Sequence, residues 1–312
     1  MRALAHQRAH RRAPVHGITL SKKLSVVPPS PPTPPHTIGH IAPPTALHAL
    51  TRQAEGLWQT LDALRPGISV EVVPTLDSTN TELMRRARAG QPYPVLLVAA
   101  EQTAGKGRRG RQWVSTPGDS LTFSLGLPLV PQDWSGLSLA VGVSLAETLH
   151  PQVQLKWPND LWWQGRKLGG ILVETASIGA ERYAVIGVGL NVQAPSSLPW
   201  PTGEPTDTTL PNPVPPAGLR ELGDTCATHD TGAWLAALAP ALLRDVLLFE
   251  QQGLAPFVPR FAARDALRGL AVQLSDGQSG TAVGIGPDGT LWLETAQGRI
   301  PVTSAEVSVR PC

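Results

Sequence analysis

Positive charge is concentrated in one glycine-rich stretch of the chain, residues 101–113, which reads EQTAGKGRRGRQW. Four cations, Lys106, Arg108, Arg109 and Arg111, are interleaved there with glycines. Glycines let the backbone approach an anion and present its N–H groups, and the cations add charge-assisted hydrogen bonds. The stretch therefore predicts a loop that binds a polyphosphate, although it lacks the spacing of a Walker A motif. A solvated charge run or a nucleic-acid patch is the alternative.

A second group of charged side chains is KWPND at 156–160, followed seven residues later by Lys167. A carboxylate and an ammonium on neighbouring strand ends, here Asp160 and Lys167, can hold a small anionic substrate and orient an amine nucleophile. Taken singly, Asn159 and Asp160 are turn formers, Trp157 is a core residue and Lys167 is an exposed lysine. The motif by itself leaves both interpretations open.

Two further motifs are weaker. DSTN at 77–80 places hydroxyl and amide side chains at the expected start of a helix, where free N–H groups suit a polar head group or a carboxylate. A plain helix cap is the simpler interpretation. GVGLN at 187–191 is a lone GxG on an apolar strand, for which backbone packing is the simpler interpretation.

The elements that must position these residues follow from periodicity and turn residues. The pattern predicts helices at 45–64, 77–90, 134–149 and 231–253, and Pro240 should kink or split the last of them. It predicts strands at 68–76, 93–102, 119–127, 153–157, 161–175 and 182–192. The cation-rich stretch thus lies between two buried strands. After residue 265, about five short strands with Asp-Gly turns at 276–277 and 288–289 predict a small barrel.

The resulting organisation has three parts. Residues 1–44 are rich in Pro, His and Arg and should be disordered. Residues 45–265 should form the main domain, with a proline-rich insertion at about 194–218, and residues 266–312 the small barrel.

Composition excludes several classes of protein. The net charge is +2, but beyond residue 50 the chain has 20 basic and 24 acidic side chains, which argues against a surface that coats nucleic acid. Two cysteines give no disulfide framework, so a reducing, cytoplasmic setting is expected. Six of the eight histidines fall in the first 50 residues without ligand spacing, so no metal site is expected. No unbroken run of 18 apolar residues occurs, so no membrane span is expected.

Taken in order, the motifs LDSTN, EQTAGKGRRGRQW, KWPND, RKLGGILVE and VIGVGLNV resemble those of biotin–protein ligases. The resemblance covers about four fifths of the chain, from about residue 68 to residue 312. It implies an α+β fold with a mixed sheet like that of class II aminoacyl-tRNA synthetases, followed by an SH3-like barrel. It also implies an enzyme that forms biotinyl-5′-AMP from biotin and ATP and transfers the biotinyl group to a lysine of a biotin carboxyl carrier protein.

The resemblance assigns roles by position. Lys167, Arg108 and Asp160 are the expected catalytic residues: Lys167 bonds the biotin carboxylate and the α-phosphate, and Asp160 positions the acceptor amine. The expected biotin-binding residues are Ser78, Thr79, Asn80, Gln102, Lys106, Gly107, Arg108, Trp113, Lys167 and Gly170. The expected ATP- and adenylate-binding residues are Arg108, Arg109, Arg111, Asn159, Lys167 and Asn191. Mg²⁺ should accompany ATP with phosphate and water as its main ligands, because no carboxylate cage is evident.

The sequence departs from the family in two places. Lys106 stands where arginine is more usual, which keeps the charge but loses bidentate geometry. The bifunctional members carry an N-terminal winged helix-turn-helix, whereas residues 1–44 show no recognition-helix pattern, so a monofunctional ligase without a nucleic-acid partner is expected. Members also dimerise edge to edge through the sheet, so a homodimer is an open expectation. The alternatives are a lipoate or octanoate ligase or transferase of the same fold, and a nucleic-acid-binding regulator.

Overall fold

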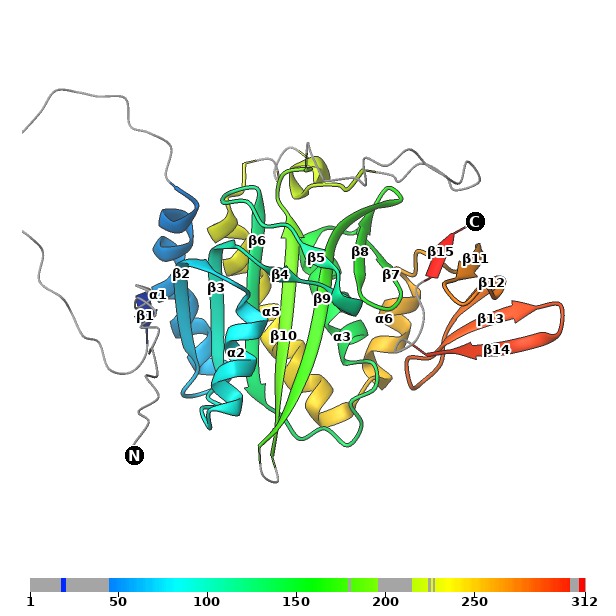
Figure 1. Cartoon of the computed structure of the whole chain (residues 1–312), viewed down its shortest axis with the longest axis horizontal. Coiled ribbons are helices and arrows are strands. Elements are labelled where there is room, and N and C mark those ends of the chain that lie inside the picture. Colours follow the sequence, from blue (N-terminus) through cyan, green and yellow to red (C-terminus); the bar gives the residue numbers. More distant parts are fainter. Residues whose placement is uncertain are drawn as a thin grey trace, which may run out of the picture.

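The computed structural model describes residues 18–20, 45–178, 181–195, 215–223, 226, 228–303 and 309–311. Within these ranges a large mixed sheet carries helices on both faces, and a small antiparallel sheet lies at one end of it (Figure 1). Most of the predicted disordered tail and of the proline-rich insertion falls outside the described residues. Those two predictions therefore stay predictions, as do the domain boundaries.

Eight strands form the large sheet in the order β1-β2-β3-β6-β10-β9-β8-β7. Their bounds are β1 Ile18–Leu20, β2 Ser69–Leu76, β3 Val95–Gln102, β6 Ser120–Pro128, β7 Gln154–Lys156, β8 Asp160–Trp163, β9 Arg166–Ile178 and β10 Glu181–Asn191. Only β2 and β3 run parallel, and the other neighbouring pairs are antiparallel. The central strand β3 is buried from Val95 to Ala100 because both faces of the sheet are covered.

The helices divide between the two faces (Figure 1). Helix α2 (Thr79–Arg88) packs on one face, where Leu83 and Met84 join a small core with Val185 of β10. Helices α1 (Ala46–Leu64), α3 (Leu137–Leu149) and α5 (Thr231–Gln252) cover the opposite face and enclose the larger core. The short helix η2 (Leu219–Leu222) precedes α5, and the short helices η3 (Ala255–Phe257) and α6 (Val258–Ala262) come after it.

Helix α5 differs from its prediction in two ways. It runs unbroken from Thr231 to Gln252, so Pro240 lies inside the helix without splitting it. It is also long and apolar enough to cross a membrane by length and composition. The sequence alone did not indicate this, because only unbroken runs of apolar residues were considered. The apolar residues of α5 lie in the core of this structure: 56% of its most apolar 18-residue segment is buried, and the helix packs against α1 and α3. The composition of α5 is thus that of a core helix.

The edge of the sheet also differs from the prediction. Residues 18–20, within the predicted tail, pair with Glu71 and its neighbours on β2 as strand β1. The sequence there is ITL, which contains β-branched residues and no proline, so its backbone groups are available for the ladder. The proline-rich run begins only at Pro28.

The C-terminal sheet has five strands, as the sequence predicts, in the order β14-β13-β12-β11-β15. Their bounds are β11 Ala271–Leu274, β12 Ser279–Ile285, β13 Leu291–Thr295, β14 Gly298–Val302 and β15 Val309–Pro311. Gly277 and Gly289 of the two Asp-Gly turns have φ of 92° and 83°, the left-handed conformation that glycine adopts without strain. This arrangement is consistent with the expected SH3-like module.

Candidate active site

One pocket collects nearly all the residues that the sequence singles out. It lies at the start of α2, between the cation-rich stretch and the middle of β9 and β10. It is lined by Ser78, Thr79, Asn80, Gln102, Lys106, Gly107, Arg108, Arg109, Arg111, Gln112, Trp113, Lys156, Trp157, Pro158, Asn159, Asp160, Lys167, Gly170, Ile171, Leu172, Gly187, Val188 and Gly189. Every predicted site residue except Asn191 is in this set.

The DSTN motif forms one wall of the pocket and also starts α2. Ser78 is the N-cap, and its buried hydroxyl accepts a hydrogen bond from the backbone N–H of Thr81. The backbone N–H and the hydroxyl of Thr79 lie 2.7 and 3.0 Å from Oε1 of Gln102, at the end of β3. Two motifs that are 23 residues apart in sequence are therefore joined in the wall. The motif is a helix cap and part of the pocket wall at once.

Asn80 is held from three directions. Its amide nitrogen donates to the Leu172 carbonyl at 3.1 Å and to the Glu174 carboxylate at 2.9 Å, both on β9. Its Oδ1 lies 2.6 Å from the hydroxyl of Ser124 on β6, which donates to it. Asn80 is only 3% exposed, so these bonds fix the amide without competition from water.

Two glycines of β10 make room for this wall. A Cβ on Gly187 would lie 2.1 Å from Oδ1 of Asn80, and a Cβ on Gly189 would lie 2.5 Å from the Trp113 indole. Real carbon atoms do not approach so closely, so any side chain at either position would displace its neighbour. The GVGLN motif is thus more than a backbone-packing feature, because its glycines form part of the pocket floor.

One side of the pocket is uncharged and is buried or half-buried. We call its residues, Ser78, Thr79, Asn80, Gln102, Gly187 and Gly189, the floor of the pocket.

The cation-rich stretch forms a short hairpin over the pocket. Strands β4 (Gly105–Lys106) and β5 (Gln112–Trp113) pair antiparallel, and the turn η1 (Arg108–Gly110) joins them. The N–H of Gly107 donates to the Arg111 carbonyl at 2.7 Å and closes the turn. Lys106, Arg109 and Arg111 are exposed, whereas Arg108 is half-buried. We refer to residues 105–113 as the cation loop.

Arg108 connects the cation loop to the KWPND turn. Its guanidinium donates to Oδ1 of Asn159 at 3.1 Å. Burial lowers the pKa of Arg108, with smaller contributions from the charges of Arg109 and Arg111, and the carboxylate of Asp160 opposes the shift. An arginine with a lowered pKa still carries its charge at neutral pH. A desolvated cation crowded by like charges gains from any anion that enters the pocket.

Lys167 and Asp160 face each other across β8 and β9. The Lys167 ammonium lies 2.7 Å from Oδ1 of Asp160, and neither side chain is fully exposed. A Cβ on Gly170 would lie 3.3 Å from the same ammonium, so the glycine leaves space beside it. The predicted carboxylate–ammonium pair therefore exists, and it opens into the pocket.

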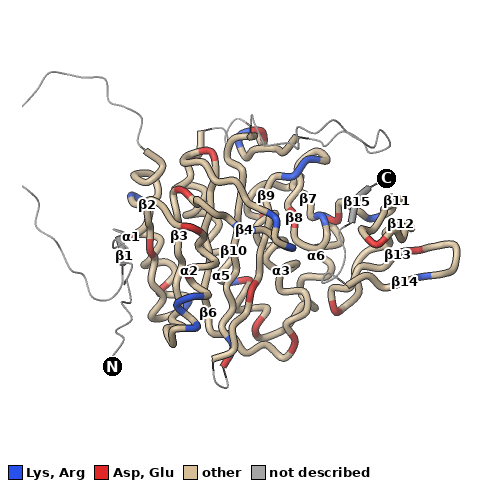
Figure 2. The backbone as a smooth tube through the Cα atoms, in the orientation of Figure 1, with Lys and Arg blue, Asp and Glu red and all other residues tan. Residues whose placement is uncertain are grey.

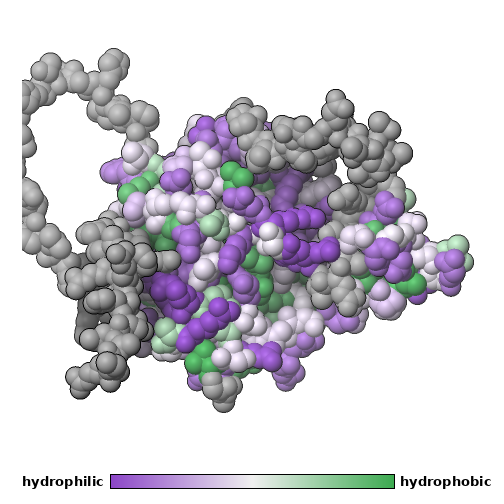
Figure 3. Space-filling view, in the orientation of Figure 1, coloured by the Kyte–Doolittle hydropathy of each residue, from purple (hydrophilic) through white to green (hydrophobic). Residues whose placement is uncertain are grey.

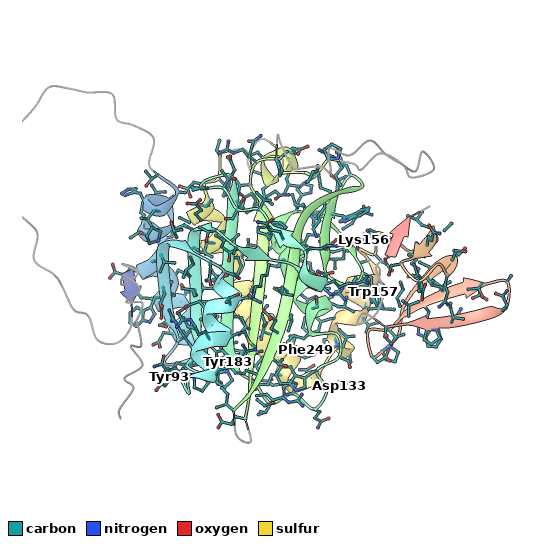
Figure 4. The ribbon with its side chains drawn as sticks, in the orientation of Figure 1. Tyr93, Asp133, Lys156, Trp157, Tyr183 and Phe249 are labelled. Atoms are coloured by element: carbon teal, nitrogen blue, oxygen red, sulfur yellow. The ribbon has the colours of Figure 1, made fainter. Side chains whose placement is uncertain are left out.

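The KWPND turn is held from behind by the C-terminal sheet. The indole N–H of Trp157 donates to the Gly289 carbonyl at 3.0 Å, in the buried interface between the two sheets. Figure 4 labels Lys156 and Trp157 on the side of the large sheet that faces this module. Asn159 donates through its amide to the Ile171 carbonyl at 2.9 Å, which anchors the other end of the turn to β9.

Charge is distributed unequally around the pocket. Six cations line it, namely Lys106, Arg108, Arg109, Arg111, Lys156 and Lys167, and among the described lining residues the only carboxylate is Asp160. Figure 2 shows the blue segments beside β4, β8 and β9, and hydrophilic side chains cover the same region in the space-filling view of Figure 3. An arrangement with this charge ratio suits a ligand with several negative charges.

Asn191 lies elsewhere. It is 6% exposed, and its amide donates to the Ala217 carbonyl at 3.1 Å and lies 3.5 Å from the Lys167 carbonyl. It does not line the pocket in this structure, so its predicted contact with the adenine stays a prediction. What the structure shows is an amide that ties the backbone of Lys167 to the chain at Ala217.

Sequence reasoning missed Ser124, Glu174 and the two glycines of β10 as supports of the pocket. Ser120, Thr122 and Ser124 alternate with apolar residues along β6, and all three are buried. Polar residues at every second position of a buried strand need hydrogen-bond partners on one face of the sheet. That alternation was the signal available for Ser124.

No group of three or more His, Cys, Asp or Glu side chains that could hold a metal ion occurs within the described part of the chain. The Asp160 carboxylate is already engaged by Lys167. A divalent ion that enters with a nucleotide would therefore be held mainly by phosphate oxygens and water, a ligand set that Mg²⁺ commonly keeps.

Comparison with known proteins gives one consistent result. Residues 72–191 match the Biotin/lipoate A/B protein ligase family. The chain is 35% identical over 257 residues to the Bifunctional ligase/repressor BirA of Escherichia coli K12, covering 78% of this chain and 75% of that protein. It is 32% identical over 246 residues to the Biotin--[acetyl-CoA-carboxylase] ligase of Paracoccus denitrificans, covering 74% of this chain and 96% of that protein.

Solved structures agree with the sequence comparison. The biotin protein ligase of Aquifex aeolicus in complex with biotin and ATP superposes with a TM-score of 0.62 and 25% identity. The alignment covers 78% of this chain and 99% of that one. The likeness therefore includes both the large sheet and the C-terminal module.

Proposed function

The chain belongs to the biotin–protein ligase family, and from that premise we propose how its own residues carry out the reaction. It is an ATP-dependent ligase that attaches biotin to protein through biotinyl-5′-AMP. In the first half-reaction a carboxylate oxygen of biotin attacks the α-phosphorus of ATP and pyrophosphate leaves. In the second, an amine attacks the acyl carbon and AMP leaves.

The floor is the proposed site for the bicyclic head of biotin. That head is neutral and carries both hydrogen-bond donors and acceptors. The floor offers buried hydroxyl groups and a half-buried amide, all held in place by their neighbours. Ser78, Thr79 and Gln102 supply these groups, and Asn80 fixes the wall through its bonds to Ser124 and β9. Preorganised donors and acceptors favour binding because little conformational freedom is lost when the ligand arrives.

The cations are proposed to offset the repulsion between the biotin carboxylate and the phosphates of ATP. A carboxylate brought to 4 Å from a phosphate charge is repelled by ~4 kcal/mol at an effective dielectric constant near 20. Lys167 lines the same pocket as the floor and the cation loop, so it can bond the carboxylate and the α-phosphate together. Arg108, with Arg109 and Arg111, stabilises the charge that develops at phosphorus. Closure of the glycine-containing loop would then shield the anhydride from water.

Asp160 has two proposed roles. Before ligands bind, its carboxylate holds the Lys167 ammonium 2.7 Å away and keeps it directed into the pocket. Once the adenylate engages Lys167, Asp160 can accept a hydrogen bond from the incoming amine and orient it toward the acyl carbon. Mg²⁺ bound to the phosphates would withdraw charge from them.

The acceptor is proposed to be a lysine of a biotin carboxyl carrier protein or domain. The relative from Paracoccus denitrificans is named as a ligase for acetyl-CoA carboxylase, which supports this choice. Mixing the purified chain with biotin, ATP and a carrier domain should give a mass increase of one biotinyl group on one lysine. Failure to modify the domain while biotinyl-AMP accumulates would reject the carrier domain that was tested.

The observation that carries the proposal is that one pocket is lined by a neutral floor and by six cations, Lys167 among them. Biotin-dependent exchange between ATP and pyrophosphate tests it, with lipoate as the control acid. Exchange with biotin and not with lipoate is expected. Exchange with lipoate alone would support the lipoate-ligase alternative, which the matched family also includes. Absence of exchange with either acid, together with salt-dependent DNA binding, would favour the nucleic-acid alternative.

A further inference from the structure

Two hydrogen bonds connect the C-terminal sheet to the two sides of the pocket, and they differ in kind. Trp157 donates to the Gly289 carbonyl at 3.0 Å across 132 residues of sequence, in a buried setting. Arg109 of the cation loop donates to the hydroxyl of Ser275 at 3.2 Å across 166 residues, in an exposed setting. Ser275 lies in the turn between β11 and β12.

The first bond belongs to a fixed interface. Trp157 is 2% exposed. A Cβ on Gly289 would lie 3.1 Å from both Leu139 and Leu254 of the main domain, so the turn sits in close contact with it. Because this contact is buried and closely packed, the C-terminal sheet offers a stationary support beside the pocket.

The second bond reaches the tip of the cation loop, where the backbone is in an uncommon conformation. Arg109 has φ of 57°, and Gly110 follows with φ of 73°, so the top of the cation loop adopts the left-handed conformation at two successive residues. Residues other than glycine seldom adopt this conformation because it costs ~1–3 kcal/mol, so neighbouring contacts must offset the cost. The contact with Ser275 ties the Arg109 side chain to the stationary sheet.

We propose that Ser275 is a positioning residue that latches the cation loop closed over the pocket. Arg108 is the residue before Arg109 and reaches Asn159 at 3.1 Å, so fixing Arg109 also restricts Arg108. The bond is exposed, and exposed bonds are weak enough to break and re-form as ligands enter. The latch itself does not depend on the proposed function. Its consequence, slower escape of biotinyl-AMP, rests on that function.

Limited proteolysis of the ligand-free full chain tests the latch directly. Trypsin cleaves after Lys and Arg, and the cation loop contains Lys106, Arg108, Arg109 and Arg111. Ser275→Ala should accelerate cleavage within the loop, measured by mass spectrometry of the fragments, by roughly three- to tenfold. Ser275→Thr keeps the hydroxyl and should behave like the parent.

Ser279→Ala is the matched control. Ser279 lies four residues farther along, is exposed on β12, and makes no side-chain hydrogen bond among the described residues. It should leave the cleavage rate unchanged. Cleavage of the loop at the parental rate in Ser275→Ala would overturn the latch. Faster cleavage throughout that variant, with a lowered unfolding midpoint, would overturn it as well, because the effect would then come from the fold.

Retention of the adenylate tests the consequence. Biotinyl-AMP formed on the enzyme should leave Ser275→Ala faster than the parent by the same factor as the change in cleavage, with an unchanged KM for biotin. Faster cleavage with unchanged release would overturn the role in retention. A parent protein that forms no adenylate would contradict the proposed function and would leave the proteolysis result standing.

Discussion

Asn80 and Arg109 lie on opposite sides of one pocket, and they are held in opposite ways. Asn80 is 3% exposed and is fixed by bonds to β6 and β9. Arg109 is exposed, and it donates a hydrogen bond to the hydroxyl of Ser275 in the C-terminal sheet. The floor is thus neutral and held by buried hydrogen bonds, whereas the cation loop is charged and mostly exposed. A floor held in this way suits a ligand of fixed shape, and an exposed cationic loop suits a ligand whose charge changes during the reaction.

Lys167 belongs to neither region alone, so its removal should have the largest effect. Lys167→Ala should slow biotin-dependent ATP–pyrophosphate exchange by roughly 10²–10³-fold, because it deletes the cation that we propose to bridge the carboxylate and the α-phosphate. Asp160→Asn is the companion variant, and it should retain most of the exchange activity while transfer to the acceptor slows. Normal pyrophosphate release by Lys167→Ala would contradict the bridging role.

Gly187→Ala tests the rigidity of the floor. The new Cβ would lie 2.1 Å from Oδ1 of Asn80, so Asn80 must move and take its bonds with it. Overpacking of this kind costs ~1–3 kcal/mol, so biotin affinity should fall by roughly tenfold to a hundredfold, as measured by calorimetry. ATP affinity should change little.

Gly56→Ala is the control for that substitution. Gly56 lies within α1, and a Cβ there meets no atom within 4 Å. This variant should bind biotin like the parent. If Gly187→Ala also binds biotin like the parent, the floor can adapt to the added methyl group and is not rigid.

Arg108→Ala tests the cation loop. Loss of a charge-assisted bond of ~1.5–3 kcal/mol should slow adenylate formation and speed the escape of biotinyl-AMP by roughly tenfold to a hundredfold. Rapid-filtration assays of bound adenylate measure the escape. Arg88→Ala, an exposed arginine at the end of α2 and outside the pocket lining, is the control. Equal retention of adenylate by Arg108→Ala and the parent would remove the loop from the mechanism.

Ser124→Ala should have a smaller effect, on the floor only. It deletes the hydroxyl that donates to Oδ1 of Asn80 at 2.6 Å and should raise the KM for biotin about fivefold, corresponding to ~1 kcal/mol. Ser144→Ala is the control, since the Ser144 hydroxyl is buried in α3 without a partner among the described residues. An unchanged KM for biotin in Ser124→Ala would mean that Asn80 is held well enough by β9 alone.

Ionic strength should affect ligand binding to the two regions differently, and this is the smallest of the expected effects. Raising salt from about 50 to about 500 mM shortens the screening length severalfold and should weaken ATP binding about threefold, because the cation loop is exposed. Biotin binding to the neutral floor should not change. Equal salt dependence for the two ligands, measured by calorimetry, would contradict the division into a neutral floor and a charged loop.

The chemistry of the site could be predicted because it is carried by short contiguous motifs. Short motifs contain the cations of residues 101–113, Asp160 and Lys167. The apolar pattern on either side of these motifs predicts the strands that flank them. Hydrophobic periodicity also gave the main helices and the five C-terminal strands. The predicted split of α5 at Pro240 is wrong, since packing on two sides of a helix can retain a proline that local propensity would reject, whereas the alternative of a kink stays a prediction.

The amino-acid sequence by itself determined which charged and polar side chains are available to line the pocket. Only the tertiary structure decided which distant groups hold them. Ser124 lies beneath Asn80, Gly289 accepts from Trp157, and Ser275 meets Arg109, across separations of 44, 132 and 166 residues. Such contacts depend on strand order, register and the docking of two modules, and a local pattern of residues carries no information about any of these.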